Sequence, residues 1–233
     1  MSRTFKALSA LLTYPTAELQ NAGHDLCAAI ATEHLIRPSE RRTIESLIDK
    51  IESSDLYDLQ EAYVLLFDRT RSLSLHLFEH VHGESRDRGQ AMIDLKTMYE
   101  QNGLEIAAAE LPDFLPLFLE FLSTLPQARA CELLAQPAHI LSALAERLRK
   151  RGSAYEAVFR ALVSLSHAQP KSEDVAAVLQ EPDFEPTDFA ALDAAWEDEP
   201  VSFGPSAASC KDGLISRLRA ARRPAPDVPT RGA

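Results

Sequence analysis

The chain has 233 residues with 35 acidic and 24 basic side chains, which gives a formal net charge of −11 at pH 7. This length and an apolar fraction of 45% suffice for one domain with a hydrophobic core, and they exclude an intrinsically disordered acidic chain. Because nucleic-acid binders need a basic surface, we expect no nucleic-acid partner. No apolar stretch reaches the roughly 17 to 25 residues that cross a bilayer. Residues 1–14 lack the features of a secretory leader, so we expect a cytoplasmic protein.

Apolar residues recur at helical spacing along most of the chain, and only 8 glycines interrupt them. This spacing predicts helices over residues 5–12, 19–31, 40–51, 56–66, 86–102, 129–149, 153–167, 173–180 and 188–198. Four of these are preceded by residues suited to cap a helix N-terminus: Ser39, Asp55, Ser172 and Thr187. Gly103 is placed to end one helix, and Pro137 is placed to divide residues 129–149 in two. The sequence therefore predicts an all-α, single-domain bundle of about nine to eleven helices.

Two segments depart from this pattern. Residues 72–82 alternate leucine with polar residues as a strand does, but no partner strand is evident. We therefore expect an extended connection across the surface of the bundle. In residues 111–125, nine of 15 side chains are Leu or Phe and they lie on all sides, which indicates a helix buried in the core or covered by another molecule.

The chain changes character near residue 200. Residues 181–199 hold eight acidic and no basic side chains, whereas residues 201–233 hold six basic and two acidic side chains and four prolines. Residues 201–233 thus carry +4, which leaves −15 on residues 1–200. We expect one helical domain, residues 1–200, followed by a flexible basic tail, residues 201–233.

The densest group of potential metal ligands is a histidine cluster with two glutamates nearby: His76, His80, His82, Glu79 and Glu84. It leaves open a metal-dependent hydrolase. The alternating pattern places His76 away from the other two histidines, and no H-E-x-x-H order occurs, so we favour imidazoles that hydrogen-bond within a polar loop. The three cysteines form neither a disulfide framework nor a zinc motif. Since no nucleophile elbow, P-loop or dinucleotide-binding glycine pattern occurs either, we expect no enzyme activity, no metal and no cofactor.

Residues 61–69, 78–92 and 110–117 resemble the NarJ family, the assembly chaperones of membrane-bound respiratory nitrate reductase. This family belongs to the redox-enzyme maturation chaperones of the TorD and DmsD types. The similarity extends from about Phe5 to Phe203 and leaves the tail uncovered. In many relatives His occupies the position of Phe114, in an Asp-His element associated with guanine nucleotide binding, so the resemblance does not imply nucleotide binding here.

The resemblance implies an all-helical chaperone that binds the N-terminal segment of the catalytic subunit. Such a chaperone keeps its client competent for molybdenum-cofactor and iron–sulfur insertion before membrane attachment. It also implies contact with proteins that deliver the molybdenum cofactor, and transient proximity to the membrane through the client. A permanent structural subunit of a membrane oxidoreductase remains an alternative.

Helix-in-groove recognition of a basic leader needs apolar surface and a polar rim, and excess negative charge would speed the encounter. We expect the peptide-binding residues to be Tyr63, Phe67, Phe78, Glu79, His80, His82, Gly83, Glu84, Arg86, Arg88, Asp113, Leu117, Phe118 and Phe121. Glu79 and Glu84 are expected to meet cations of the leader. Arg86 and Arg88 are expected to brace the loop, although the sequence equally allows the reverse assignment.

Overall fold

The computed structural model describes residues 1–82, 86–106, 110–180 and 183. Within these residues the regular structure is helical: α1 (Arg3–Leu11), α2 (Ala17–Asn21), α3 (Gly23–Thr32), α4 (Pro38–Ser53), α5 (Leu56–Tyr63), α6 (Glu79–His82), α7 (Arg86–Gln101), α8 (Leu115–Thr124), α9 (Gln127–Leu134), α10 (Ala138–Lys150), α11 (Glu156–Leu165) and α12 (Ser172–Leu179). A π-helix, Val64–Asp68, continues α5, and a 3-10 turn covers Arg71–Leu73. The predicted all-α fold is confirmed.

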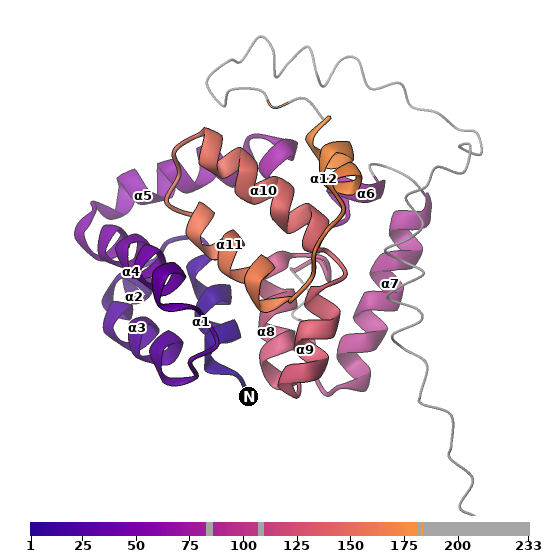
Figure 1. Ribbon diagram of the computed structural model, residues 1–233, viewed down its shortest axis with the longest axis horizontal. Coiled ribbons are helices and arrows are strands. Elements are labelled where there is room, and N and C mark those ends of the chain that lie inside the picture. The colour runs from indigo at the N-terminus through magenta and orange to yellow at the C-terminus, as the bar shows by residue number, and fades with distance from the viewer. Residues whose placement is uncertain (83–85, 107–109, 181–182, 184–233) are drawn as a thin grey trace, which may run out of the picture.

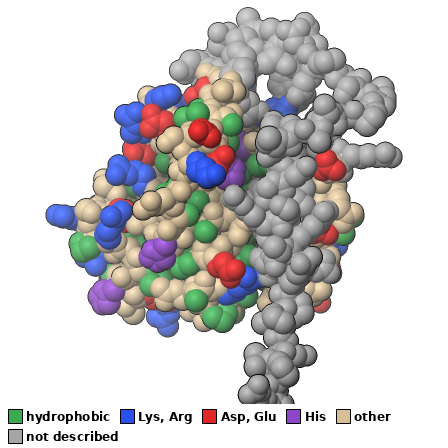
Figure 2. All heavy atoms as spheres, turned by 45° about the vertical axis from the view of Figure 1, so that its right-hand side comes forward, with side chains coloured by type: hydrophobic (Ala, Val, Ile, Leu, Met, Phe, Trp, Pro, Cys, Tyr) green, Lys and Arg blue, Asp and Glu red, His purple; other side chains and the backbone are tan. Residues whose placement is uncertain are grey.

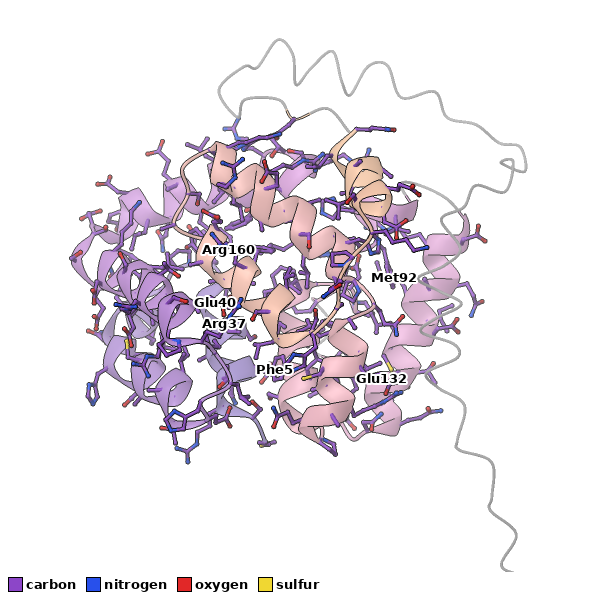
Figure 3. The ribbon with its side chains drawn as sticks, in the orientation of Figure 1. Phe5, Arg37, Glu40, Met92, Glu132 and Arg160 are labelled. Carbon is purple, nitrogen blue, oxygen red and sulfur yellow. The ribbon has the colours of Figure 1, made fainter. Side chains whose placement is uncertain are left out.

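The helices form one bundle around a continuous hydrophobic core. Helices α1 to α5 gather at one end, α7, α8 and α9 lie at the other, and α10 and α11 cross between them (Figure 1). Helix α10 packs against α11 and α12, and α1 packs against α8. Their fully buried rings include Phe5, labelled in Figure 3, and Phe159. No helix in the described part of the chain is long and apolar enough to cross a membrane.

Glu33, which follows α3, forms hydrogen bonds with the residues at the start of α1. Its carboxylate accepts hydrogen bonds from the Ser2 hydroxyl at 2.7 Å and from the backbone N–H groups of Arg3 at 2.8 Å and Thr4 at 2.9 Å. Burial alone would raise the pKa of Glu33, but these hydrogen bonds outweigh it and lower that pKa to about 2. A distant side chain thus caps α1, whose first N–H groups have no partner within the helix.

Several local predictions are confirmed. Asp55 caps α5, since its carboxylate accepts the backbone N–H of Tyr57 at 2.8 Å. Gly103 follows α7 with a φ of +79°, a backbone conformation that glycine adopts without strain. Pro137 separates α9 from α10. The Leu- and Phe-rich segment forms α8, which is buried along most of its length.

Two predicted caps are wrong. Helix α4 begins at Pro38 with Arg37 as its N-cap, not at Ser39, because proline has no N–H to lose in the first turn. Helix α12 begins with Ser172 itself, and Lys171 is its N-cap. The predicted helix over residues 188–198 and the tail, residues 201–233, lie outside the described residues.

Residues 19–31 form two helices rather than one, because the chain breaks at Ala22 between α2 and α3. Gly23 begins α3 close to the side chain of Glu52: a Cβ at Gly23 would lie 2.1 Å from the Glu52 carboxyl carbon. A residue with a Cβ at this position would require the exposed Glu52 side chain to turn aside.

The prediction of an extended surface connection over residues 72–82 is also wrong. The segment begins within the 3-10 turn and ends in α6, and its leucines Leu73, Leu75 and Leu77 are all buried. It is extended only around His76, which forms an isolated antiparallel bridge with Phe114. The partner of this short stretch is the loop before α8, which the alternating pattern does not identify.

Candidate functional site

Two of the three runs of sequence that carry the family resemblance, residues 78–92 and 110–117, meet at a buried carboxylate. Asp113, which is 0% exposed, accepts the backbone N–H of Phe78 at 3.0 Å, and its other oxygen lies 3.2 Å from Nδ1 of His76. The backbone carbonyl of Asp113 accepts the N–H of Leu77 at 3.1 Å. We call residues 75–79 and 112–115 the Asp113 junction. Because a buried carboxylate must be satisfied by hydrogen bonds, this group fixes the backbone that leads into α6.

Side chains around the Asp113 junction hold it from both sides. The His80 Nε2 atom lies 2.8 Å from the carbonyl oxygen of Ser74. The Phe114 ring lies against the His76 ring at 5.3 Å between centroids. Arg88 at the start of α7 pairs with Glu79 of α6 at 3.3 Å, and both side chains are about one-fifth exposed. The predicted residues Phe78, Glu79, Arg88 and Asp113 are therefore neighbours in space.

The electrostatics of the Asp113 junction favour a charged histidine. The hydrogen bond to Asp113 raises the pKa of His76, burial acts against this, and the charges of Asp113 and Glu79 add to the increase while Arg88 opposes it. Burial raises the pKa of Asp68, and the nearby His76 moderates that increase. His76, Glu79 and Asp68 thus form a charged group at the edge of the buried carboxylate.

An aromatic cluster lies next to this charged group. Tyr63, Phe67 and Tyr155 contact one another, with ring centroids 5.0 Å apart for Tyr63 and Phe67 and 5.1 Å apart for Phe67 and Tyr155. Tyr14 meets the edge of the cluster at 5.6 Å from Tyr63 and is 46% exposed. Burial raises the pKa of Tyr63 well above its usual value and that of Tyr155 to about 12. The charge of Asp68, the residue that follows Phe67, adds to the increase at Tyr63.

Most of the apolar residues predicted to bind a peptide are buried in this conformation. Tyr63, Phe67, Phe78, Phe118 and Phe121 are each at most 4% exposed. These rings belong to the core, so their predicted contact with a partner requires a neighbouring element to move.

The remaining predicted residues differ in how far the structure describes them. Leu117 is partly exposed on α8. Gly83 and Glu84 lie outside the described residues, as do the side chains of His82 and Arg86. Their predicted roles stay predictions.

Sequence reasoning did not assign Tyr14, Asp68 and Tyr155 to the site, and it considered His76 as a hydrogen-bonding imidazole or a metal ligand rather than as a peptide-binding residue. Tyr14 follows α1 and Tyr155 precedes α11, so nothing in helical spacing pairs them with Tyr63. The only signal for Asp68 is its position in the run of residues 61–69.

The histidines do not form a metal site in the part of the molecule that is described. No group of three or more His, Cys, Asp or Glu side chains there is arranged to hold a metal ion. His76 faces Asp113, and His80 faces a backbone carbonyl. Burial raises the pKa of the Cys27 and Cys131 thiols, which is opposite to what a cysteine nucleophile requires.

The negative charge is unevenly distributed along the chain. Residues 181–199 contribute −8 of the −15 on residues 1–200, although they are less than a tenth of that length. On the coloured part of the face in Figure 2, acidic and basic side chains are interspersed rather than gathered into one patch. One carboxylate of the acidic segment is described: Asp183 accepts the Ser72 hydroxyl at 2.6 Å and pairs with Arg151.

The family model described as nitrate reductase delta subunit matches residues 33–161, which include the Asp113 junction. The chain belongs to this family. It is 43% identical to the nitrate reductase molybdenum cofactor assembly chaperone NarJ of Escherichia coli (strain K12), over 84% of this chain and 83% of that protein.

Two further relatives extend this picture. The chain is 39% identical to the probable nitrate reductase molybdenum cofactor assembly chaperone NarW of the same strain, over 96% of this chain and 93% of that protein. It is 34% identical to the probable nitrate reductase molybdenum cofactor assembly chaperone NarJ of Bacillus subtilis (strain 168), over 69% of this chain and 86% of that protein. The family expected from the three runs of sequence is confirmed.

Proposed function

We propose that this chain is an assembly chaperone of a respiratory nitrate reductase. It binds the N-terminal leader of the catalytic subunit and holds the subunit competent for molybdenum-cofactor and iron–sulfur insertion before membrane attachment. The observation that carries the proposal is the 43% identity, over most of both chains, to a protein named as a chaperone for molybdenum cofactor assembly of nitrate reductase. Proteins that deliver the cofactor are proposed as transient second partners.

The chaperone acts by binding and performs no covalent step. Asp113 fixes the backbone of residues 76–78 from inside, and Glu79 follows directly at the start of α6. Glu79 holds the cation of Arg88 in this conformation and is proposed to hold a Lys or Arg of the leader in the complex. An exchange of one cation for another keeps the carboxylate paired throughout, which avoids the cost of a partly buried single charge.

Negative charge contributes to the rate of encounter more than to the strength of the complex. The acidic segment, residues 181–199, holds more than half of the charge of residues 1–200 and is proposed to attract the basic leader over a distance of about one Debye length. Contacts at the Asp113 junction then supply specificity.

The proposal is tested by titration calorimetry with a synthetic peptide of the first residues of the nitrate reductase catalytic subunit from the same organism. We expect saturable binding at a ratio of one to one. Glu79→Lys is expected to weaken binding about tenfold, since it replaces an attraction by a repulsion. Asp49→Lys, the same charge change at an exposed position of α4, is the matched control and is expected to leave the affinity unchanged. Absence of saturable binding would contradict the proposed function, and equal weakening by both variants would contradict the role of Glu79.

A further inference from the structure

Helix α7 lies at one edge of the bundle with one face inward and one face outward (Figure 1). Its inward residues are Ala91, Leu95, Met98 and Tyr99, a spacing of four, three and one residues that makes a single stripe. Met92 also packs partly against the core (Figure 3). On the opposite face Ile93 is 59% exposed. The 16-residue helix therefore packs on the bundle along one stripe within residues 91–99.

The inward face of α7 covers residues that the sequence assigns to peptide binding. The Tyr99 ring lies on the Phe121 ring of α8 at 4.6 Å between centroids. The Tyr99 hydroxyl donates to the carbonyl oxygen of Pro112 at 2.7 Å. At the other end of α7, Arg88 pairs with Glu79. We call Glu79, Pro112 and Phe121 the α7 seat.

We propose that the α7 seat is the binding site for the amphipathic leader helix, and that α7 occupies it until the leader displaces α7. The inference rests on the proposed function and gives it a location. It also explains how Phe121 could bind a peptide, as the sequence predicts, although the structure shows it 0% exposed. Displacement of α7 exposes the Phe121 ring, the Pro112 carbonyl and the Glu79 carboxylate together.

The contacts of α7 match those that a basic amphipathic leader would bring. Arg88 supplies a cation to Glu79, and the stripe of apolar residues covers the ring of Phe121. The leader therefore replaces the ion pair with Glu79 and the apolar cover of Phe121 by interactions of the same kind, while the Pro112 carbonyl that Tyr99 releases accepts a hydrogen bond from the leader or from water. The seat itself stays in place, because the Asp113 junction holds Pro112 and the residues before Glu79 independently of α7.

The polar contacts between α7 and its seat are of the weaker kinds. Arg88 and Glu79 are both partly exposed to solvent, and ion pairs in that environment contribute little to stability. The Tyr99 hydroxyl bond joins two neutral groups. We call the protein closed when α7 occupies its seat and open when α7 has left it. Because the contacts of α7 are weak, the closed form predominates but the open form stays accessible. The apparent affinity for the leader depends on the population of this open form.

The first test is Tyr99→Phe, which removes the hydroxyl bond from α7 and leaves every atom of the seat intact. It weakens the closed form only, so the affinity for the leader peptide is expected to rise about two- to tenfold. Ser9→Ala is the matched control. It removes a hydroxyl-to-carbonyl bond of the same length, 2.7 Å, from Ser9 to Pro116, which joins α1 to α8 and does not involve α7. The affinity of this variant is expected to stay unchanged.

The second test is amide hydrogen exchange of the whole protein with and without saturating leader peptide. Displacement predicts faster exchange in residues 90–101 of α7 and slower exchange in residues 115–122 of α8. Unchanged affinity in Tyr99→Phe, or unchanged exchange in α7 while the leader binds saturably, would overturn the α7 seat and leave the chaperone function standing. Absence of saturable binding would overturn both.

Discussion

Replacement of Asp113 by asparagine tests the core of the site with almost no change in volume. In the wild type one carboxylate oxygen accepts the Phe78 N–H and the other faces His76, and the whole side chain is buried. Asparagine keeps one acceptor and turns the other position into a donor. The variant therefore loses the charge of the junction and its pairing with a protonated His76, while the packing of α8 is retained.

The size of the effect follows from the kind of hydrogen bond that is lost. Bonds to a charged group contribute about 1.5–3 kcal/mol each, whereas neutral ones contribute about 1 kcal/mol. We therefore expect Asp113→Asn to lower the free energy of unfolding by about 2 kcal/mol at pH 6. The pKa of His76 is raised in the folded protein. Its pairing with Asp113 thus stabilises fully below the unfolded pKa of about 6.5, and this contribution is lost as the pH rises through the folded pKa.

Urea unfolding of the wild type and of Asp113→Asn, at about pH 6 and about pH 9, measures the loss in free energy of unfolding and the direction in which this loss changes with pH. The difference between the two proteins is expected to be larger at the lower pH. In the background of His76→Gln the same change is expected to lose most of its pH dependence, since the titrating partner is gone. A difference that is independent of pH, or larger at high pH, would refute the assignment of the His76–Asp113 pair.

Three further changes test the fold. Glu33→Gln is expected to cost about 1–2 kcal/mol at pH 7. Because the pKa of Glu33 is lowered to about 2, urea unfolding should show this loss shrinking as the pH falls from about 4.5 towards 2, and a constant loss would contradict it. Gly89→Ala is expected to stabilise the protein by about 0.5–1 kcal/mol in thermal unfolding, since a Cβ there meets nothing within 4 Å, and destabilisation would contradict the placement of α7. Arg147→Met removes a buried guanidinium that donates to the carbonyl oxygens of Ser72 at 2.6 Å and Val178 at 2.9 Å. Urea unfolding is expected to show a loss of about 3 kcal/mol in the free energy of unfolding, and a loss under about 1 kcal/mol would contradict this role of Arg147.

Residue preferences at helix ends predict those parts of the fold that depend on a few neighbouring residues. Asp55 caps a helix because its carboxylate reaches an N–H two residues on, Gly103 follows the end of α7 with a positive φ, and Pro137 is the N-cap of α10. The same preferences place a cap at Ser39, two residues beyond the observed N-cap Arg37, because Pro38 can itself begin a helix. Helix positions are thus readable from sequence to within a residue or two.

The Asp113 junction was only partly predictable, because its members are distant in the sequence. The sequence runs single out Phe78 and Asp113, but nothing in the sequence indicates that this carboxylate meets a backbone N–H at a separation of 35 positions. For the same reason the alternating leucines around His76 indicated a surface connection, whereas the loop before α8 buries them. A period of two residues shows that a segment is extended and does not show what lies beside it.

Burial of the apolar site residues could be predicted, but not the element that covers them. The composition of residues 111–125 indicated a helix that is buried or covered by another molecule. The structure shows that a helix of the same chain, α7, lies on Phe121. Sequence periodicity assigns a face to each helix and leaves open which faces meet, so the α7 seat emerged only from the structure.

We propose that this chain serves the assembly of a nitrate reductase and is not part of the finished enzyme. The most direct measurement is the molybdenum content of the enzyme purified from cells with and without the gene for this chain, with the subunits of both preparations quantified. The account predicts that the enzyme made without the chain contains its structural subunits but little molybdenum, and that the chain is absent from the complete enzyme. Full molybdenum content without the chain, or its presence in equal amounts with the catalytic subunit, would contradict the account.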